Sequence, residues 1–280
     1  MITDGQIHLW DDEGRGGQSW AAGTKPDLEK AMTGARFAAL MDEVGVARAI
    51  ITPPGIYGFD CSHAIRCAEE YSRRFAVVIR WTLDDEAGWA RLPDLCEQPH
   101  VLGIRLALTS QNLASWRPAG RLDRFFAQAA ALRIPLMLFT NGDLSAVEDA
   151  ARNHPHLRLV VDHANLVGAM PETISARIDA LEDLARYANV GVKLSALPLR
   201  SSGLYPFADL HAPIDRIYRL FGSSRLMWAS DLTTTLAQRK GSYADSLDLI
   251  RIAALRHIPD AEMEDILGRT VSTWFDWPSR

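Results

Sequence analysis

Two histidines and an aspartate stand at the ends of short apolar runs in this chain of 280 residues: His8, His163 and Asp231. The three runs lie far apart in the sequence. An imidazole or a carboxylate at the end of a strand can move a proton to or from a reacting group. Two imidazoles and a carboxylate can also hold one zinc ion and leave a fourth position for water. These residues therefore predict either general acid–base chemistry or a single-metal site.

For these side chains to act together, the apolar runs must be strands that end at one edge of a common sheet. Eight such runs recur, at 2–8, 46–53, 75–81, 101–107, 134–140, 157–163, 190–195 and 226–231. Their spacing leaves room for one helix and two loops in each interval. Runs that are apolar on both faces are typical of parallel strands covered by helices, and eight of them in this length match a (β/α)8 barrel. A doubly wound open sheet is the alternative, but no GxGxxG turn follows the first run.

We therefore expect residues 1–280 to form one α/β domain, a (β/α)8 TIM barrel. The composition, with 48% hydrophobic and 23% charged residues, is that of a globular protein. A net charge of -5 without long runs of like charge argues against nucleic-acid partners and a polybasic membrane surface. No apolar stretch reaches the roughly 18 residues of a membrane-spanning helix, so we expect a cytoplasmic protein. Cys61, Cys67 and Cys96 are odd in number and form no CxxC pair, which argues against disulfides and a thiolate zinc site.

Two connections that follow strands are long and carry aromatic residues, at 10–33 and 196–211. Loops after the strands of a barrel form its active-site face. We therefore expect these loops to supply a lid or a pocket wall, with Trp10 and Tyr205 as substrate contacts. The aromatic segment 274–278 at the end of the last helix instead favours a packing plug.

Four motifs resemble the first, sixth, seventh and last strand motifs of the amidohydrolase-related family of barrel hydrolases. They are DGQIHLW at 4–10, VVDH at 160–163, GVKLS at 191–195 and LMWASD at 226–231. The branch that they most resemble contains sugar lactonases and 2-pyrone-4,6-dicarboxylate lactonase. The resemblance spans nearly the whole chain and implies a hydrolase that acts on a small molecule. The order and spacing of the motifs are specific for the family and much less so for the substrate.

The first motif departs from the family pattern, which is usually Asp-x-His-x-His. Gln6 stands where the first histidine should be, so only His8 of that pair remains. Two imidazoles one residue apart on a strand point to the same side and can chelate one ion, whereas an amide is a weak zinc ligand. No bridging lysine or glutamate lies near Arg105, and the fifth run ends without a histidine. These absences argue against a two-metal site.

The remaining metal alternative is one zinc ion held by His8, His163 and Asp231. We favour a site that requires no cofactor, which is how the pyrone lactonase branch is thought to work. Under this interpretation the resemblance implies a lactonase in which Asp231 is the general base that activates water. His8, His163 and the Gln6 amide would then donate hydrogen bonds to the lactone carbonyl. An aspartate with an ordinary pKa of about 3.9 is a weak base, so we expect burial to raise the pKa of Asp231.

Charged residues on the other strands suggest how a substrate would be held. Arg105 resembles an arginine of the lactonase branch that grips a substrate carboxylate, and Arg80 would form a second arm. A guanidinium suits a carboxylate because two donors match two oxygens in one plane; the alternative for each arginine is an ion pair with a neighbouring acid. We expect Asp4 to fix backbone, Lys193 to form a structural ion pair and Asp162 to orient a neighbour.

The sequence thus predicts a hydrolase that opens a small, carboxylate-bearing lactone. One alternative is a single-zinc hydrolase or decarboxylase that acts on an amide, an ester or an aromatic acid. Another is a barrel that binds a ligand and has lost catalysis together with its first histidine. The presence of Asp231 argues against this last alternative.

Overall fold

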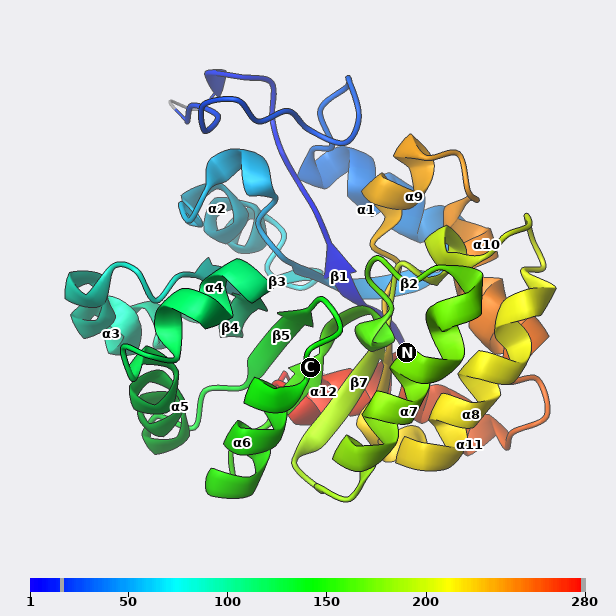
Figure 1. Cartoon of the computed structure of the whole chain (residues 1–280). Helices are drawn as coiled ribbons and strands as arrows, with labels where there is room; N and C mark the ends of the chain where they lie inside the picture. Colours follow the sequence, from blue (N-terminus) through cyan, green and yellow to red (C-terminus); the bar gives the residue numbers. More distant parts are fainter. Residues whose placement is uncertain (16–17, 278–280) are drawn as a thin grey trace.

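The computed structural model describes residues 1–15 and 18–277, and within these ranges the strands form one eight-stranded parallel sheet. The strands are β1 Ile2–Ile7, β2 Val46–Ile51, β3 Phe75–Trp81, β4 Val101–Leu108, β5 Leu136–Thr140, β6 Leu159–Val161, β7 Val190–Leu194 and β8 Leu226–Trp228. Each strand pairs with the next one in the sequence. Figure 1 shows the strands at the centre of the molecule with the helices around them. The predicted (β/α)8 barrel is therefore confirmed.

Helices surround the barrel (Figure 1), and the last of them closes one end of it. They are α1 Gly34–Val44, α2 Ser62–Glu70, α3 Leu92–Cys96, α4 Ser110–Trp116, α5 Arg121–Ala131, α6 Ser145–Asn153, α7 Ile174–Ala185, α8 His211–Phe221, α9 Leu232–Ala237, α10 Tyr243–Asp248, α11 Asp260–Glu264 and α12 Thr270–Trp274. Helix α5 illustrates the pattern, because its buried Leu122, Phe125, Phe126 and Ala129 follow the helical period. Two π-helical segments, Leu249–Ala254 and Asp265–Arg269, continue α10 and α11.

Several strands end before the predicted limits, and for two of them the difference has a physical cause. Strand β6 ends at Val161 and β8 ends at Trp228. Beyond them, His163 and Asp231 adopt left-handed backbone conformations, with φ of 54° and 48°. Such conformations cost about 1–3 kcal/mol in residues other than glycine and concentrate at functional sites. They turn the backbone away from the strand direction at the carboxyl end of the barrel.

The barrel closes where β8 approaches β1. The amide of Asp231 donates to the carbonyl of Gln6 over 3.2 Å. A side chain at Gly5 would place its Cβ 3.0 Å from the carbonyl oxygen of Trp228, so this close approach requires glycine. The seam therefore brings the end of β8 directly beside the end of β1.

The opposite end of the barrel is filled by apolar side chains. Inward-facing residues of the strands cluster there with the last helix: Ile50, Val78, Met137, Val160, Met227, Val271, Trp274 and Phe275. The guanidinium of Arg48 lies over the ring of Trp277, 4.2 Å from its centroid, and donates to Ser272 Oγ. The predicted packing plug is confirmed for residues 274–277, and Pro278 lies outside the described residues.

The long loop after β1 is tied to its neighbours rather than free. The amide of Trp10 donates to the carbonyl of Met32, and the amide of Ala21 donates to the carbonyl of Ile56. Gln18 Nε2 donates to a carboxylate oxygen of Asp60 over 2.8 Å. Residues 16 and 17 of this loop lie outside the described residues. In Figure 1 the loop rises from the end of β1 beside α1 and α2, so it forms a wall of the barrel mouth.

Two further expectations concern the cysteines and the membrane. Cys61, Cys67 and Cys96 are free thiols, as predicted. Among the described residues, no helix combines the length and apolarity needed to cross a membrane.

Candidate active site

A polar layer lies directly above the apolar plug, and the two-residue period of the strands produces it. Residues two positions apart on a strand face the same side. The plug residues Ile50, Val78 and Val160 are therefore followed on the inner face by Thr52, Arg80 and Asp162. Gln6 and Lys193 join this layer from β1 and β7. The sequence thus changes from apolar to polar at one level of the barrel.

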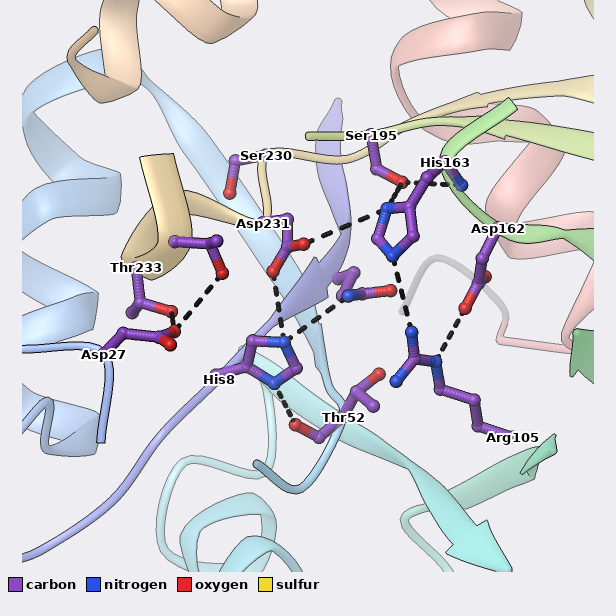
Figure 2. Close-up of polar contacts among 12 residues, drawn as sticks. His8, Asp27, Thr52, Arg105, Asp162, His163, Ser195, Ser230, Asp231 and Thr233 are labelled. Atoms are coloured by element: carbon purple, nitrogen blue, oxygen red, sulfur yellow. Dashed lines mark hydrogen bonds and ion pairs between the residues drawn. The ribbon is translucent and has the colours of Figure 1, made fainter. Parts of the chain in front are cut away.

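At the mouth, the two predicted histidines converge on the predicted aspartate (Figure 2). His8 Nε2 lies 3.1 Å from Asp231 Oδ1, and His163 Nδ1 lies 3.9 Å from Asp231 Oδ2. Only 6% of the surface of Asp231 is exposed. The structure therefore brings together His8, His163 and Asp231, which come from strands far apart in the sequence.

The other hydrogen bond of His8 restricts where its protons can be. His8 Nδ1 lies 2.6 Å from the carbonyl oxygen of Thr52, which can only accept, so Nδ1 carries a proton. A hydrogen bond between His8 Nε2 and Asp231 Oδ1 then needs one more proton, on the imidazole or on the carboxyl group. The contact between His8 Nε2 and Asp231 Oδ1 can therefore hold one further proton between the two residues.

The pKa of Asp231 shifts in the opposite direction from the one expected. Burial raises this pKa, but the hydrogen bond and charge of His8 and the charges of His163 and Arg105 outweigh burial and hold it well below the usual range. The expectation of a raised pKa was therefore wrong, because it considered desolvation without the imidazole partner. Asp231 is a carboxylate at neutral pH.

His163 is held by neighbours on both ring nitrogens. Its Nδ1 lies 2.8 Å from Ser195 Oγ, and its Nε2 lies 3.4 Å from Nη2 of Arg105. Because a guanidinium only donates, Nε2 accepts and Nδ1 carries the proton of the neutral ring. Burial lowers the pKa of His163 to about 4, although the charges of Asp231 and Asp162 oppose this shift. His163 is thus neutral at pH 7 and presents one fixed donor.

Asp4 fixes the seam next to Asp231, in agreement with the role expected for it. Its Oδ1 accepts from the amides of Gln6 and Ser230, and its Oδ2 accepts from the hydroxyls of Ser230 and Tyr243. The carboxyl is fully buried, and burial raises its pKa to about 6 against these hydrogen bonds. Asp4 therefore holds the backbone that carries Asp231.

Asp162 binds two cations inside the barrel. Its Oδ2 accepts from Arg105 Nε over 2.6 Å, and its Oδ1 lies 2.7 Å from Lys193 Nζ. Lys193 is fully buried; burial lowers its pKa and the charge of Asp162 opposes this. The ion pair predicted for Lys193 and the orienting role predicted for Asp162 are both seen. Arg105 likewise has the acidic neighbour that was its alternative, but only through Nε.

A cavity of about 430 Å³ opens beside this network, large enough for a small molecule. Of the predicted residues, it is lined by His8, Trp10, Arg80 and Arg105. Loop residues complete the lining: Thr24, Lys25, Pro26, Asp27, Pro53, Pro54, Gly55, Ile56 and Thr234. Asp231 and His163 lie behind this wall, in contact with His8 and Arg105 respectively.

Arg80 differs from Arg105 in its surroundings. Its guanidinium faces the ring of Phe59 at 5.5 Å and makes no ion pair or side-chain hydrogen bond within the described part of the chain. Burial and the charge of Arg105 lower the pKa of Arg80. Two guanidinium groups thus face one cavity. Asp27, a carboxylate in the same lining, accepts from the hydroxyls of Thr233 and Thr234 and makes no ion pair with Arg80.

Tyr205 is not among the residues that line this cavity, and its contact with substrate stays a prediction. Its side chain is 41% exposed and packs edge-to-face on Phe207. Asp209 accepts hydrogen bonds from Ser201 Oγ and from the amide of Ser202, which fixes the loop. Tyr205 was selected as an aromatic residue of a long loop. The hydrogen bonds of Asp209 that fix this loop have no signal in the sequence.

Arg200 is a candidate that sequence reasoning missed. It ends a short 3-10 helix, Leu197–Arg200, directly after β7, and its Nε has no hydrogen-bond partner within the described ranges. Burial lowers its pKa, and the charge of Asp231 opposes this, so the two groups lie close enough to interact. The available signal was a basic residue five positions after the GVKLS motif at 191–195. The prediction for this loop considered only its aromatic residues.

The arrangement fits a metal ion poorly. Within residues 1–15 and 18–277, no group of three or more His, Cys, Asp and Glu side chains is placed to hold one. The donor atoms that a zinc ion would use are engaged, since His8 Nε2 contacts Asp231 and His163 Nδ1 contacts Ser195. In place of the family's first histidine, Gln6 presents its oxygen to the ammonium group of Lys193.

A family comparison places this fold and site in context. Residues 3–271 match the model of a family described as amidohydrolase. The chain belongs to the amidohydrolase family. The resemblance seen in the four strand motifs is therefore confirmed.

Two curated relatives of this amidohydrolase act on lactones. An L-fucono-1,5-lactonase from Burkholderia ambifaria is 28% identical over 251 residues, which cover 86% of this chain and 83% of that protein. A 4-sulfomuconolactone hydrolase from Rhizobium radiobacter is 24% identical and covers 81% of this chain and 74% of its own.

Solved structures share the fold of this amidohydrolase. A zinc-bound amidohydrolase from Burkholderia multivorans superposes with a TM-score of 0.83 at 22% identity, covering 99% of this chain and 100% of that one. A probable 2-pyrone-4,6-dicarboxylic acid hydrolase from Acinetobacter baumannii, with citric acid bound, gives a TM-score of 0.79 at 16% identity and covers 99% of both chains.

Proposed function

We propose that this amidohydrolase hydrolyses a small lactone that carries an anionic group. One observation carries the proposal: a carboxylate held between two imidazoles lies beside a cavity in which the guanidinium of Arg80 has no partner. The first feature suits activation of water, and the second suits an anionic substituent of the substrate. The lactone hydrolases among the relatives, one of which is named for a sulfonated lactone, support the same substrate class.

The proposed reaction begins with a water molecule next to Asp231. Asp231 takes a proton from this water, and the oxygen attacks the carbonyl carbon of the lactone. The proton is then held in the 3.1 Å contact between Asp231 and His8 Nε2. This sharing compensates for the low basicity that the depressed pKa gives to Asp231 alone. When the ring C–O bond breaks, the proton passes to the leaving alkoxide and a hydroxy acid is released.

The oxyanion of the tetrahedral intermediate needs hydrogen-bond donors. The Gln6 amide, which faces His8 Nε2, and the Nδ1–H of His163, which also contacts Ser195 Oγ, would supply these donors. Each well-placed donor contributes about 3–4 kcal/mol. His8, expected as a third donor, contacts Asp231 through Nε2 and works with it on the proton instead. No metal ion takes part in this proposal.

The substrate's anionic group would lie against Arg80 and Arg105. Arg105 is fixed through its Nε by Asp162 and through Nη2 by His163, so its Nη1 would face the substrate. Lys25 and Thr234 lie on the same cavity and would contact the rest of the molecule. The cavity volume admits a compound of one ring with short substituents.

A matched panel of lactones tests the proposal. Each ring would be offered with a carboxylate or sulfonate and as the neutral amide or ester, with and without a chelator. We expect turnover of anionic members that is unaffected by chelation, with kcat/KM at least about tenfold above the neutral matches. Activity confined to esters or amides, or lost on chelation, would favour the single-zinc alternative. Tight binding of anionic lactones without turnover would favour the ligand-binding alternative.

A further inference from the structure

Lys193 is a buried charge for which the proposed reaction has no direct use. It projects from β7 into the barrel and has no exposed surface. Its Nζ lies 2.7 Å from Asp162 Oδ1, 2.6 Å from Gln6 Oε1 and 3.2 Å from Met137 Sδ. Its three protons therefore have three partners, and the ammonium group is held in one place.

The charges around Lys193 do not cancel locally. Asp162 also accepts from Arg105, so one carboxylate faces two cations. A purely structural buried pair would contain one charge of each sign, because an uncompensated charge inside a protein is costly. The charge of Asp231 also interacts with Lys193 and opposes the remaining positive charge. The positive charge that Asp162 leaves uncompensated therefore acts on Asp231, in the candidate active site.

Lys193 also decides which way the Gln6 amide points. An ammonium group can only donate, so the amide must turn its oxygen toward Nζ. The amide nitrogen then faces His8 Nε2 at 3.5 Å, beside the contact between His8 and Asp231. Without Lys193 the two amide orientations would differ little in energy, and the oxygen could occupy the donor position.

We propose that Lys193 is the resident cation of this site, which fixes the Gln6 amide as a donor to the reacting carbonyl oxygen and supplies positive charge where a His-x-His site would hold a metal ion. Lys193 is a positioning residue, since it acts through Gln6 and touches no substrate. The part that concerns the carbonyl rests on the proposed lactone hydrolysis. The part that concerns the metal does not.

Zinc binding by four proteins tests the charge of Lys193 without any substrate. They are the wild type, Gln6→His, Lys193→Met and the double variant, titrated with zinc by calorimetry. Gln6→His restores the missing imidazole but leaves the ammonium group beside it, which repels a divalent ion. We expect the double variant to bind zinc at least about tenfold more tightly than Gln6→His, and the other two to bind weakly. Equal affinity of Gln6→His and the double variant would overturn the proposal.

A second variant keeps the test decisive if removal of Lys193 prevents folding. Gln6→Glu retains an oxygen for Lys193, gains an ion pair with it, and replaces the N–H donor with a carboxylate oxygen. We expect its thermal midpoint to equal or exceed that of the wild type while kcat falls about a hundredfold or more with KM nearly unchanged, the scale for one oxyanion donor. An unchanged kcat would show that the Gln6 N–H donates nothing to the reacting carbonyl oxygen, and that result would overturn the proposal.

Lys30→Met is the matched control for the loss of one lysine charge, because Lys30 is exposed and does not line the cavity. It should leave kcat and zinc binding unchanged. If the wild type opens no lactone, the proposed function fails, and the zinc series still decides whether Lys193 acts as the resident cation.

Discussion

Arg80 and Arg105 stand opposite each other on β3 and β4, yet they are held differently. Arg105 is bonded through Nε to Asp162, so part of its charge serves the protein. Arg80 has only the ring of Phe59 beside its guanidinium in the described structure. A free guanidinium in a cavity contributes little to folding and is available to a ligand. The two residues should therefore respond differently to mutation.

We predict that Arg80→Met raises KM for an anionic lactone at least about tenfold and leaves kcat nearly unchanged. A charge-assisted hydrogen bond contributes about 1.5–3 kcal/mol, and a contact made equally in ground and transition states appears in KM. The thermal midpoint should stay the same or rise, because no protein partner is lost. Steady-state kinetics on a charged lactone and on its neutral match measure the effect; an equal change on both would assign Arg80 to packing.

Arg105→Lys should act on both folding and binding. An ammonium group cannot bond Asp162 and present coplanar donors to a carboxylate at the same time. We expect a raised KM for the anionic lactone together with a lower thermal midpoint. Kinetics equal to those of the wild type would show that Arg105 serves only the ion pair with Asp162.

The low pKa of His163 makes a prediction for stability. Its pKa is about 4 in the folded protein and about 6.5 in an unfolded chain. Between pH 7 and pH 5 the unfolded chain therefore gains a proton at this residue that the folded protein refuses, which costs about 2 kcal/mol of stability. Urea unfolding of the wild type and of His163→Gln at both pH values measures it. The stability advantage of the wild type should shrink by this amount at pH 5; a difference that does not depend on pH would contradict the assignment.

The sequence allowed these residues to be selected but did not reveal their contacts. His8, His163 and Asp231 were found because each ends an apolar run. Which ring nitrogen of His8 faces Asp231 depends on the carbonyl of Thr52, 44 residues away, and no local pattern encodes that contact. The direction of the Asp231 pKa shift was missed for the same reason, since it depends on the imidazole of His8 beside the carboxylate.

At the scale of elements, apolar runs predicted all eight strands, and the errors lie at their ends. The predicted runs continued through His163 and Asp231 because these residues follow apolar neighbours directly. Both adopt positive φ without being glycine, so the usual glycine signal for such a turn was absent. The same positive φ that ends each strand without a glycine also turns the side chains of His163 and Asp231 into the barrel mouth.

A substitution next to the last helix tests whether the apolar end of the barrel contributes to stability and not to catalysis. Phe275 is 1% exposed and packs among the inward-facing residues at the end opposite the cavity. We predict that Phe275→Ala costs about 3–5 kcal/mol of unfolding free energy, because it leaves a hole in the plug. The kcat of the folded fraction should stay within about twofold of the wild type, as measured below the new thermal midpoint. A large fall in kcat with little loss of stability would place the plug in the reaction.

For the whole molecule, the barrel separates a face for stability from a face for chemistry. The apolar plug fills one end, and the first polar layer above it carries the charged network. Fold and family followed from the spacing of eight strands and four motifs, because such patterns repeat along the whole chain. The lining of the cavity could not be predicted in the same way, because it comes from loops that are held in place by individual side-chain hydrogen bonds.

The central claim is that Asp231 activates water for lactone hydrolysis without a metal ion. It is tested by turnover of one anionic lactone by the wild type and by Asp231→Asn, both in chelator. Asparagine keeps the shape and the contact with His8 but cannot take a proton from water. We expect that the wild type opens the lactone, that kcat of the variant is at least about a hundredfold lower, and that the thermal midpoints stay within a few degrees. A variant that opens the lactone at nearly the wild-type rate, or a wild type that opens it only when metal is added, would contradict it.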